Sequence, residues 1–285
     1  MWAIRSPSMG RFQDKVVVIT GAGRGQGRTH ALAFAAEGAA VAVCDIAAPV
    51  ASCPYPLATP DDLSTTADLV SRSGARCHSA VVDVRDADAI GAFVADVGSA
   101  LGPIDVCVAN AGICGFAKSW ELTDEQCEEM LAIDLGGVFK TFRAVLPSMI
   151  ERRKGRLVAT SSMAGRAGNP NLSHYAAAKW GVIGFVKSVA LEVATFGITA
   201  NVVCPSTVDT PMVHNPAMYS LFAPHLERPG IDEVRPVYER MNPMHLDWLD
   251  PAEVSAAVLY LASDDARHVS GVTWEIAAGT SALKA

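Results

Sequence analysis

Several patterns that define common enzyme classes are absent from the sequence. The seven histidines form no HExxH motif and no closely spaced pair, so a histidine metal site is not expected. No GxSxG motif occurs, which argues against a Ser-His-Asp hydrolase. The seven cysteines form no CxxC pair and several lie in apolar runs, a pattern typical of buried thiols in the reducing cytoplasm. We therefore expect a cytoplasmic protein without a metal site.

Positive charge is also scarce. The chain has 23 Lys+Arg against 30 Asp+Glu, a net charge of -7, whereas binding to nucleic acid needs clustered cations. No uninterrupted apolar run approaches the roughly 20 residues that cross a bilayer. Residues 1–10 lack the apolar stretch of a signal peptide. We expect neither a nucleic acid nor a membrane as a partner.

The chain does contain a regular alternation of strand-like and helix-like segments. Hydrophobic residues make up 50% of it, enough for a large core. Strands are expected at 15–20, 39–45, 80–84, 104–109, 156–161, 198–203 and 273–277. Helices are expected from a glycine-rich turn through residue 37, and at 86–101, 124–153, 175–196 and 251–262. Connections of this length predict an α/β fold, a doubly wound seven-stranded parallel sheet in a single domain.

Three stretches lie outside this alternation. Residues 1–12 form an N-terminal extension to a domain that spans 13–285. Residues 46–60 and 211–250 are rich in proline and show no regular pattern. Long irregular loops in a compact domain are usually functional, and the apolar side chains of the 211–250 segment favour a covering role.

The first strand runs into the glycine-rich turn at 20–27. Glycines let the backbone turn sharply and approach a pyrophosphate, although an ordinary tight turn is an equally good explanation. Asp45 ends the second strand, where it can accept hydrogen bonds from an adenosine ribose. Asp45 would repel a 2′-phosphate, which indicates NAD, whereas Arg24 could pair with that phosphate. The residues predicted to hold the nucleotide here are Gly21, Gly23, Arg24, Gly25, Gln26, Gly27, Asp45 and Ile46.

Further candidate residues follow the third and fourth strands. Asp83 and Val84 end the third strand, and Asn110, Ala111 and Gly112 follow the fourth. The carboxyl ends of parallel strands bind ligands in sheets of this kind, so these residues are also predicted to contact the cofactor. Taken singly, each is explained equally well as a helix cap or a turn.

A serine, a tyrosine and a lysine form a second constellation. Ser162 closes the fifth strand, and Tyr175 and Lys179 share one helical face because they are four residues apart. A cation about 4 Å from a phenolate stabilises it by about 4 kcal/mol at an effective dielectric near 20. Lys179 would thus make Tyr175 a base suited to neutral pH, and Ser162 would hydrogen-bond the substrate oxygen. A surface lysine beside a packed tyrosine is the alternative.

Together these motifs resemble the short-chain dehydrogenase/reductase family over about residues 13–279. The matching segments are Thr20 to Gly27, Asn110-Ala-Gly112, Ser162, Tyr175-Ala-Ala-Ala-Lys179, and Asn201-Val-Val-Cys-Pro205 through Thr210. The resemblance implies a three-layer Rossmann fold, a homotetramer, Tyr175 as acid/base, and Lys179 also gripping the nicotinamide ribose. It further implies that Pro205, Val208 and Thr210 lie at the nicotinamide.

A finer resemblance is to the mycofactocin-coupled, carveol dehydrogenase-like branch of this family. It rests on segments 23–30, 55–60, 208–212 and 217–222. This resemblance implies an alcohol dehydrogenase that holds NAD so tightly that a separate redox carrier reoxidises it. It also implies that the insert at 46–60 covers the adenosine.

Two residues depart from the family pattern. Asp134 stands where the family usually has an asparagine that supports a water relay to the lysine. The carboxylate could keep the helix kink and the water while weakening the help that Lys179 gives Tyr175, or it could cost activity. Ser206 stands where glycine commonly follows the proline, which would slightly reshape the nicotinamide pocket.

The leading hypothesis is an NAD-dependent oxidoreductase that interconverts a secondary, largely apolar, terpenoid-like alcohol and its ketone. The apolar substrate is inferred from side chains that could equally belong to a core: Met212, Met218, Tyr219, Leu221, Phe222 and Met241. The alternative is a catalytically weak nucleotide-binding or sensing protein on the same scaffold. The intact set of Ser162, Tyr175 and Lys179 favours the enzyme, whereas Asp134 leaves room for the alternative.

Overall fold

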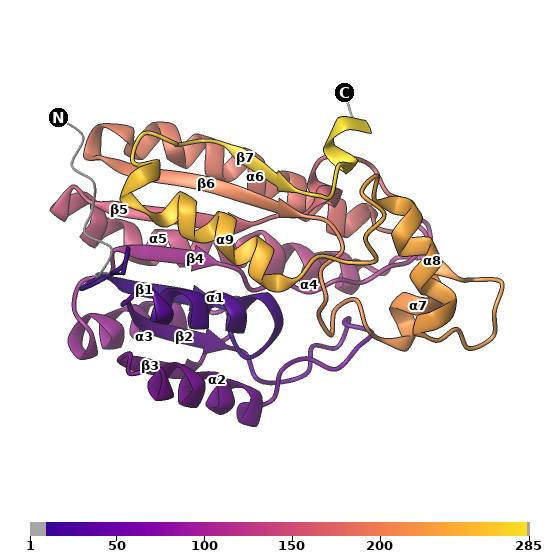
Figure 1. Cartoon of the computed structure of the whole chain (residues 1–285), viewed down its shortest axis with the longest axis horizontal. Helices are drawn as coiled ribbons and strands as arrows, with labels where there is room; N and C mark the ends of the chain where they lie inside the picture. Colours follow the sequence, from indigo (N-terminus) through magenta and orange to yellow (C-terminus); the bar gives the residue numbers. More distant parts are fainter. Residues whose placement is uncertain (1–9, 284–285) are drawn as a thin grey trace.

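The structure is a computed structural model that describes residues 10–283, and its centre is a seven-stranded parallel sheet (Figure 1). The strands are β1 Val16–Thr20, β2 Ala40–Asp45, β3 Cys77–Val81, β4 Val106–Ala109, β5 Gly155–Thr160, β6 Ile198–Pro205 and β7 Thr273–Ile276. Their order is β3-β2-β1-β4-β5-β6-β7, so the chain direction across the sheet reverses between β1 and β4. The predicted doubly wound parallel sheet is confirmed, and ligands bind beyond the strand ends at such a reversal.

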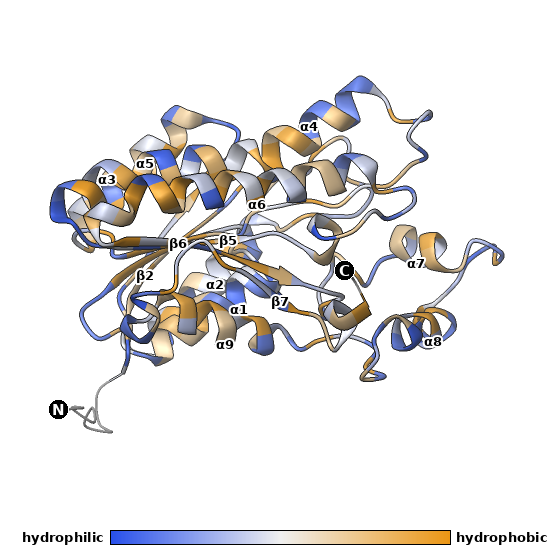
Figure 2. Ribbon diagram, turned by 90° about the horizontal axis from the view of Figure 1, so that it is seen from above, coloured by the Kyte–Doolittle hydropathy of each residue, from blue (hydrophilic) through white to orange (hydrophobic). Residues whose placement is uncertain are grey.

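Helices cover both faces of the sheet and make three layers (Figure 2). One face carries α1 Gly25–Ala36, α2 Pro60–Arg72 and α9 Pro251–Ala262; the other carries α3 Ala87–Ala100, α4 Asp124–Asp134, α5 Gly136–Arg152 and α6 Ser173–Val193. Alternate side chains of β1 enter opposite layers, because Val16 and Val18 belong to one apolar cluster and Val17 and Ile19 to another. A sheet buried on both faces explains the continuous apolar runs in the sequence.

The third strand lies upstream of its predicted position at 80–84. It is an edge strand that pairs with β2 alone, from Val41 opposite Cys77 to Asp45 opposite Val81. Its side chains are only half-buried or exposed, so it needs no continuous apolar run, and the apolar pattern indicated the residues just downstream. Asp83 and Val84 therefore lie in the loop after β3 and not at the end of the strand.

The insert ends one residue earlier than predicted, because Pro60 is the first residue of α2, a helix that the sequence analysis missed. Thr59 caps this helix by accepting the amide of Asp62 at 3.2 Å. The Asp62 carboxylate in turn accepts the amide of Thr59 at 2.8 Å. This capping box with proline at the first helical position is a strong start signal.

The predicted helix at 124–153 is divided into two. α4 ends at Asp134 and α5 begins at Gly136, with Leu135 between them. Gly137 lies so close to Val84 that a Cβ on it would be 2.7 Å from the Val84 Cγ2. At the break the Asp134 carboxylate turns inward and accepts the amide of Ile113 at 2.8 Å.

The segment at 211–250, called the lid from here on, was predicted to lack regular structure, which is wrong for two stretches. It contains α7 Pro216–Phe222 and α8 Ile231–Met241. Asn215 starts α7 by accepting the amide of Met218 at 2.9 Å. Both helices lie beyond the carboxyl ends of the strands (Figure 1), and Ala223, Val234 and Tyr238 form a small apolar cluster there.

The two ends of the lid are joined at its base. Val208 and Leu249 form an isolated parallel bridge. The Leu249 amide donates to the Thr207 carbonyl at 2.8 Å, and the Asp209 amide donates to the Leu249 carbonyl at 2.9 Å. The chain therefore leaves the sheet after β6 and returns to nearly the same point before α9.

The packed structure begins before the predicted boundary at residue 13. Phe12 is buried and meets Phe34 edge-to-face, with ring centroids 4.7 Å apart. Arg11 pairs with Glu37 at 2.8 Å. Residues 1–9 of the predicted extension lie outside the described residues. Across residues 10–283, none of the helices has the length and apolar character needed to span a membrane.

Candidate active site

The glycine-rich turn lies directly against neighbouring backbone. Gly21 has a φ of +65°, and a Cβ on it would lie 2.6 Å from the Ala111 Cα. Gly25 has a φ of +55°, and a Cβ there would lie 3.3 Å from the Thr210 Cγ2. A side chain would clash at Gly21 and would be strained at Gly25, so the turn packs tightly between the end of β4 and Thr210, the residue before the lid.

The N-terminus of α1 is an open helix end. Its cap residue, Arg24, makes no side-chain hydrogen bond to the helix amides, whereas α2, α3 and α4 are all capped by side chains. Gly25, Gln26 and Gly27 line a pocket at the carboxyl end of the sheet. The uncapped first turn and the positive end of the helix dipole therefore border this pocket, as a pyrophosphate site requires.

Asp45 is held beside the turn by backbone hydrogen bonds. Its Oδ2 accepts the amide of Gly23 at 2.9 Å, and its Oδ1 accepts the amide of Ala47 at 3.1 Å. The carboxylate also lines the pocket, where its remaining lone pairs can accept ribose hydroxyls. Arg24, which could have paired with a 2′-phosphate, instead donates to the carbonyl of Pro56 in the insert.

A chain of charged side chains links Asp83 to the insert. The Arg85 guanidinium pairs with Asp83 at 2.7 Å and with Glu129 at 2.6 Å. Glu129 also accepts the amide of Ser52 at 2.9 Å. Burial alone would raise the pKa of Asp83, but hydrogen bonds from Arg85 hold that pKa below its usual value. Asp83 therefore remains a charged acceptor with a fixed orientation at the pocket wall.

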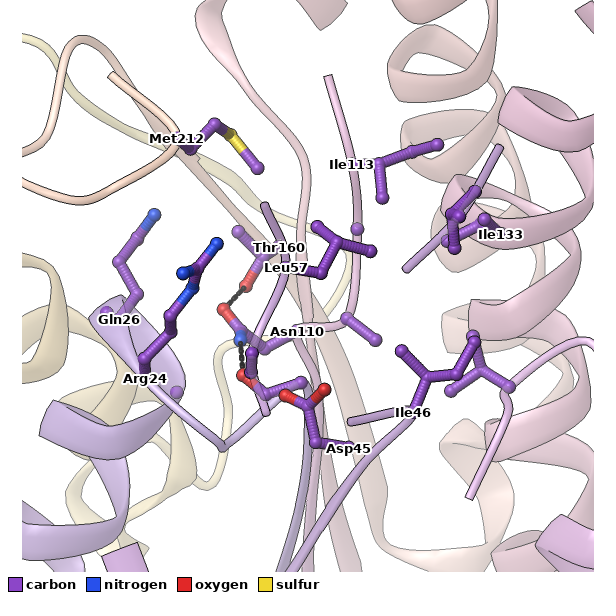
Figure 3. A pocket seen from close by; sticks show the side chains of 18 of the residues that line it. Arg24, Gln26, Asp45, Ile46, Leu57, Asn110, Ile113, Ile133, Thr160 and Met212 are labelled. Carbon is purple, nitrogen blue, oxygen red and sulfur yellow. Dashed lines mark hydrogen bonds between the residues drawn. The ribbon is translucent and has the colours of Figure 1, made fainter. Parts of the chain in front are cut away.

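Asn110 joins three strand ends at the reversal point of the sheet. Its Nδ2 donates to the carbonyls of Thr20 and Gly21, both at 3.2 Å, and its Oδ1 accepts the Thr160 hydroxyl at 3.2 Å (Figure 3). The side chain thus braces β1, β4 and β5. This bracing keeps the ends of these strands together below the pocket.

The structure brings Ser162, Tyr175 and Lys179 together. Ser162 lies two residues beyond the end of β5, where its hydroxyl accepts the amide of Ala164 at 3.1 Å. The Ser162 side chain is also near enough to the Tyr175 hydroxyl to oppose the rise of its pKa. The Lys179 Nζ lies 5.6 Å from the centre of the Tyr175 ring and donates to the Thr160 carbonyl at 3.1 Å.

Asp134 is the ion-pair partner of Lys179. The Asp134 Oδ2 and the Lys179 Nζ are 3.0 Å apart, and the two side chains are 0% and 4% exposed. A Cβ on Gly112 would lie 3.0 Å from that oxygen and 3.2 Å from that nitrogen. Burial raises the pKa of Asp134, while Lys179 and the amide of Ile113 oppose the increase. The pair is therefore almost fully buried, directly behind Gly112.

Tyr175 does not have the low pKa predicted from its neighbour Lys179. Burial raises the pKa of Tyr175 well above its usual value, and Cys114 and Asp134 raise it further, while the hydrogen bond from Ser162 opposes this. The expectation of a low pKa counted the cation and not the loss of water at Tyr175, which is the largest cause of the rise. The weaker effect of Lys179 beside Asp134 was among the alternatives that the sequence left open.

Most of the predicted site residues surround the pocket. Figure 3 shows Arg24, Gln26 and Met212 on one side of it and Ile46, Ile113 and Ile133 on the other. The predicted residues that line it are Gly21, Arg24, Gly25, Gln26, Gly27, Asp45, Ile46, Asp83, Val84, Asn110, Ala111, Gly112, Tyr175, Lys179 and Thr210. The predicted residues that do not line it are Gly23, Asp134, Ser162, Pro205 and Val208.

Sequence reasoning missed the residues that the insert contributes. Val50, Tyr55, Leu57 and Ala58 line the pocket. The Tyr55 hydroxyl accepts the amide of Cys114 at 3.1 Å, and burial raises the pKa of Tyr55 well above its usual value, so the hydroxyl stays neutral. Apolar and aromatic side chains among the prolines were the available signal, because a solvated linker has no use for them.

The two halves of the pocket serve different steps of one kind of reaction. The open helix end with Asp45 suits a dinucleotide, and a tyrosine beside a serine and a lysine can move the proton of a substrate hydroxyl. The arrangement therefore defines a dinucleotide-dependent oxidoreductase. The chain belongs to the short chain dehydrogenase family, whose profile matches residues 15–218.

Full-length relatives support this membership. The (-)-trans-carveol dehydrogenase of Rhodococcus erythropolis is 38% identical over 275 residues, which are 96% of this chain and 99% of that protein. The crystal structure of carveol dehydrogenase from Mycobacterium avium in complex with NAD matches with a TM-score of 0.94 at 42% identity, covering 97% of this chain and 100% of that one. A short chain dehydrogenase from Mycobacterium paratuberculosis bound to NAD matches with a TM-score of 0.88 at 34% identity, covering 96% and 100% of the two chains.

Proposed function

We propose that this NAD-dependent oxidoreductase interconverts a secondary, largely apolar alcohol of terpenoid type and its ketone, with Tyr175 as general acid/base. The observation that carries the proposal is the contact of Tyr175 with Ser162 and Lys179 at a pocket whose other end suits a dinucleotide. Relatives that act on carveol support the substrate class.

The residues around the pocket fit NAD. The uncapped N-terminus of α1 offers amides to a pyrophosphate, and Asp45 offers acceptors to the adenosine ribose. A lysine ammonium has three donors; Lys179 donates to the Thr160 carbonyl and forms an ion pair with Asp134, so a donor remains for the nicotinamide ribose. When bound, NAD supplies the acceptor for a hydride. Thr210 lines the pocket and would lie at the nicotinamide. Pro205 and Val208 are assigned there by the family resemblance, although they do not line the pocket.

The proton is handled by side chains of this chain. As the alcohol is oxidised, its O–H bond breaks and the Tyr175 oxygen takes the proton, while the carbinol C–H bond gives up its electron pair with the hydride. Ser162 hydrogen-bonds the substrate oxygen and stabilises the charge that develops on it. In ketone reduction Tyr175 returns the proton to that oxygen.

The lid supports an apolar substrate. Met218 of the lid belongs to the same apolar cluster as Tyr175 and Met163, and Met212, Leu221 and Phe222 pack against that cluster. Two other candidates point elsewhere: Tyr219 packs within the small cluster of the lid, and Met241 is 44% exposed. An apolar wall with a few polar groups at one end suits an alcohol on a hydrocarbon body.

The contacts of the insert support slow exchange of NAD. Residues 46–59 are anchored from three sides: Arg24 donates to the Pro56 carbonyl, the Ser52 amide to Glu129, and the Cys114 amide to the Tyr55 hydroxyl. We infer that the insert covers the adenosine, that NAD is held tightly, and that a separate redox carrier reoxidises it, as in the mycofactocin-coupled branch.

The remaining parts of the proposal concern the location of the protein in the cell and its oligomeric state. All seven cysteines are free, which suits a reducing cytoplasm. We expect a homotetramer, as is usual in the family. Light scattering coupled to size-exclusion chromatography tests this, and a monomer would contradict it.

Turnover of alcohols tests the function. The purified protein is assayed with terpene and steroid alcohols and an artificial electron acceptor, so that bound NADH is reoxidised, and ketones are detected by mass spectrometry. Tyr175→Phe should lower kcat by about 1,000-fold and still release NAD on denaturation. Tyr260→Phe, a change on α9 where the ring meets Trp274, serves as control and should retain activity.

Two outcomes would contradict the proposal. Equal turnover by Tyr175→Phe and the wild type would rule out the mechanism. If the protein releases NAD but oxidises no alcohol of the panel, a nucleotide-binding or sensing protein is the better interpretation.

A further inference from the structure

A buried ion pair lies behind the pocket and touches it only through other residues. Asp134 does not line the pocket and is fully buried. Its Oδ1 accepts the amide of Ile113 at 2.8 Å, and its Oδ2 lies 3.0 Å from the Lys179 Nζ. Ile113 and Lys179 both line the pocket. The carboxylate can therefore influence the reacting groups only through these two residues and through its charge.

The other titratable side chains around Tyr175 and the pair are neutral. They come from the insert, the loop after β4, α6 and β6: Cys53, Tyr55, Cys114, His174 and Cys204. Burial raises the pKa of Cys114 to about 12 and that of Cys204 to about 11. Burial also raises the pKa of Cys53 and Tyr55 and lowers that of His174. Asp134 is thus the charged group that raises the pKa of Tyr175, and Lys179 is the cation paired with it.

The carboxylate works against the lysine. An isolated ammonium near Tyr175 would stabilise the phenolate and make the tyrosine a better base. A carboxylate 3.0 Å from that ammonium cancels much of its field, and the burial of both side chains reduces the screening of their charges by solvent. The lysine remains in position to bind a ribose, because its ammonium is fixed between Asp134 and the Thr160 carbonyl.

We propose that Asp134 is a positioning residue that fixes the Lys179 ammonium and sets, through its charge, the pH above which Tyr175 can take a proton from the alcohol. This inference rests on the proposed function for its reaction. Ketone reduction, which needs Tyr175 protonated, then proceeds at neutral pH, and alcohol oxidation accelerates as the pH rises.

The pH profile of Asp134→Asn tests this role. Asparagine keeps an acceptor for the amide of Ile113 and removes the charge. The profile of kcat/KM for alcohol oxidation should move to lower pH by about one unit, so that the variant is about tenfold faster than the wild type at pH 7. The two profiles should converge at high pH, where Tyr175 has lost its proton in both proteins.

Asp105→Asn is the matched control at the opposite end of the sheet. Asp105 accepts the amide of Val16 at 3.2 Å and pairs with Lys154 at 3.0 Å, but it lies far from Tyr175 in the sheet. Its pH profile should coincide with that of the wild type. An unshifted profile in Asp134→Asn overturns the inference. A loss of more than about 100-fold at every pH in a folded, NAD-loaded Asp134→Asn protein also overturns it and assigns the carboxylate a direct part in proton transfer.

A measurement without turnover separates this inference from the proposed function. Protein that carries 3-fluorotyrosine has five tyrosine signals in a ¹⁹F NMR spectrum, and Tyr175→Phe identifies one of them. In the NAD-loaded protein, Asp134→Asn should lower the titration midpoint of that signal by about one pH unit. Equal midpoints overturn the inference even where an alcohol is oxidised. A shifted midpoint in a protein that oxidises no alcohol supports the role of Asp134 and contradicts the proposed function alone.

Discussion

The two ends of the sheet carry the same pair of side chains in different surroundings. At the carboxyl end, Asp134 and Lys179 are 3.0 Å apart and are 0% and 4% exposed. At the amino end, Asp105 and Lys154 are also 3.0 Å apart but are 9% and 50% exposed. Each aspartate accepts a backbone amide. The pairs therefore differ chiefly in whether the lysine is in contact with water.

This difference decides what each pair can do. Asp105 has a second cation, Arg152 at 3.3 Å, and water reaches its lysine, so the loss of one partner is compensated. Asp134 has Lys179 as its cation and no access to water, so an unpaired carboxylate would be left in the interior. The pair of Asp105 and Lys154 is a replaceable surface contact, whereas the charge of Asp134 changes the pKa of Tyr175.

Replacing the lysine of each pair should give the largest difference in stability between the two ends of the sheet. Lys179→Met should lower the free energy of unfolding by about 3 to 5 kcal/mol, because a buried charge loses its partner. Lys154→Met should lower it by less than about 1 kcal/mol. Urea unfolding measures both, and adding Asp134→Asn to Lys179→Met should recover part of the loss. Equal losses in the two single variants would show that burial does not distinguish the pairs.

Crowding the buried pair should have a smaller effect. A methyl group on Gly112 would press on Asp134 and Lys179, so Gly112→Ala should cost about 2 kcal/mol of stability and lower kcat/KM about tenfold by displacing the lysine. A methyl group on Gly91 in α3 would point into open space, and Gly91→Ala should stabilise by up to about 1 kcal/mol. Thermal unfolding and kinetics measure both, and an unaffected Gly112→Ala protein would show that the pair has room to move.

The smallest expected effect is a difference in the pH dependence of stability. Burial raises the pKa of Asp134 above its usual 3.8, so the folded state binds more protons, and the free energy of unfolding should fall as the pH rises from 3.8 to the raised value. At the amino end, hydrogen bonds from Arg11 lower the pKa of Glu37 below its usual 4.5. The contribution of Glu37 is present above 4.5 and lost as the pH falls through the lowered value.

Two charge-neutralising variants distinguish these two pH dependences of the free energy of unfolding, which is measured by urea unfolding between pH 3 and pH 8. Asp134→Asn should abolish the fall with rising pH, and Glu37→Gln should abolish the loss in acid. If Asp134→Asn left the fall with rising pH unchanged, the buried Asp134 carboxylate would not be the group that titrates in that range.

The parts of the fold that were predictable are those with local signals. Strands β1, β2, β4, β5, β6 and β7 lie close to their predicted ranges, because burial on both faces makes most of them continuous apolar runs. Strand β3 was misplaced because its side chains are only half-buried or exposed and form no apolar run. Helix α7 had a readable start in Asn215 and Pro216, but the surrounding prolines hid it.

Site residues were predictable where the sheet topology fixes their position. They were not predictable where contacts between distant parts of the chain fix it. Parallel strands bring Asp45, Gly112 and the residues near Ser162 to one edge, whatever the side chains do. The contact of Tyr55 with Cys114 joins residues 59 apart in sequence, and no periodicity announces it. The protonation of Tyr175 depends on burial, a three-dimensional quantity, so the expectation from Lys179 alone had the wrong sign.

The bridge between Val208 and Leu249 allows the sequence and length of the lid to vary. Because both ends of the lid meet at this bridge, its length and content can change without moving β6 or α9. The entropy of closing a flexible loop rises by only about 0.6 kcal/mol for each doubling of length. The lid also has its own small core around Val234 and Tyr238, so these internal contacts are kept when the lid is exchanged as a unit. Grafting a foreign lid at Val208 and Leu249 is therefore a practical route to new substrates on an unchanged catalytic base.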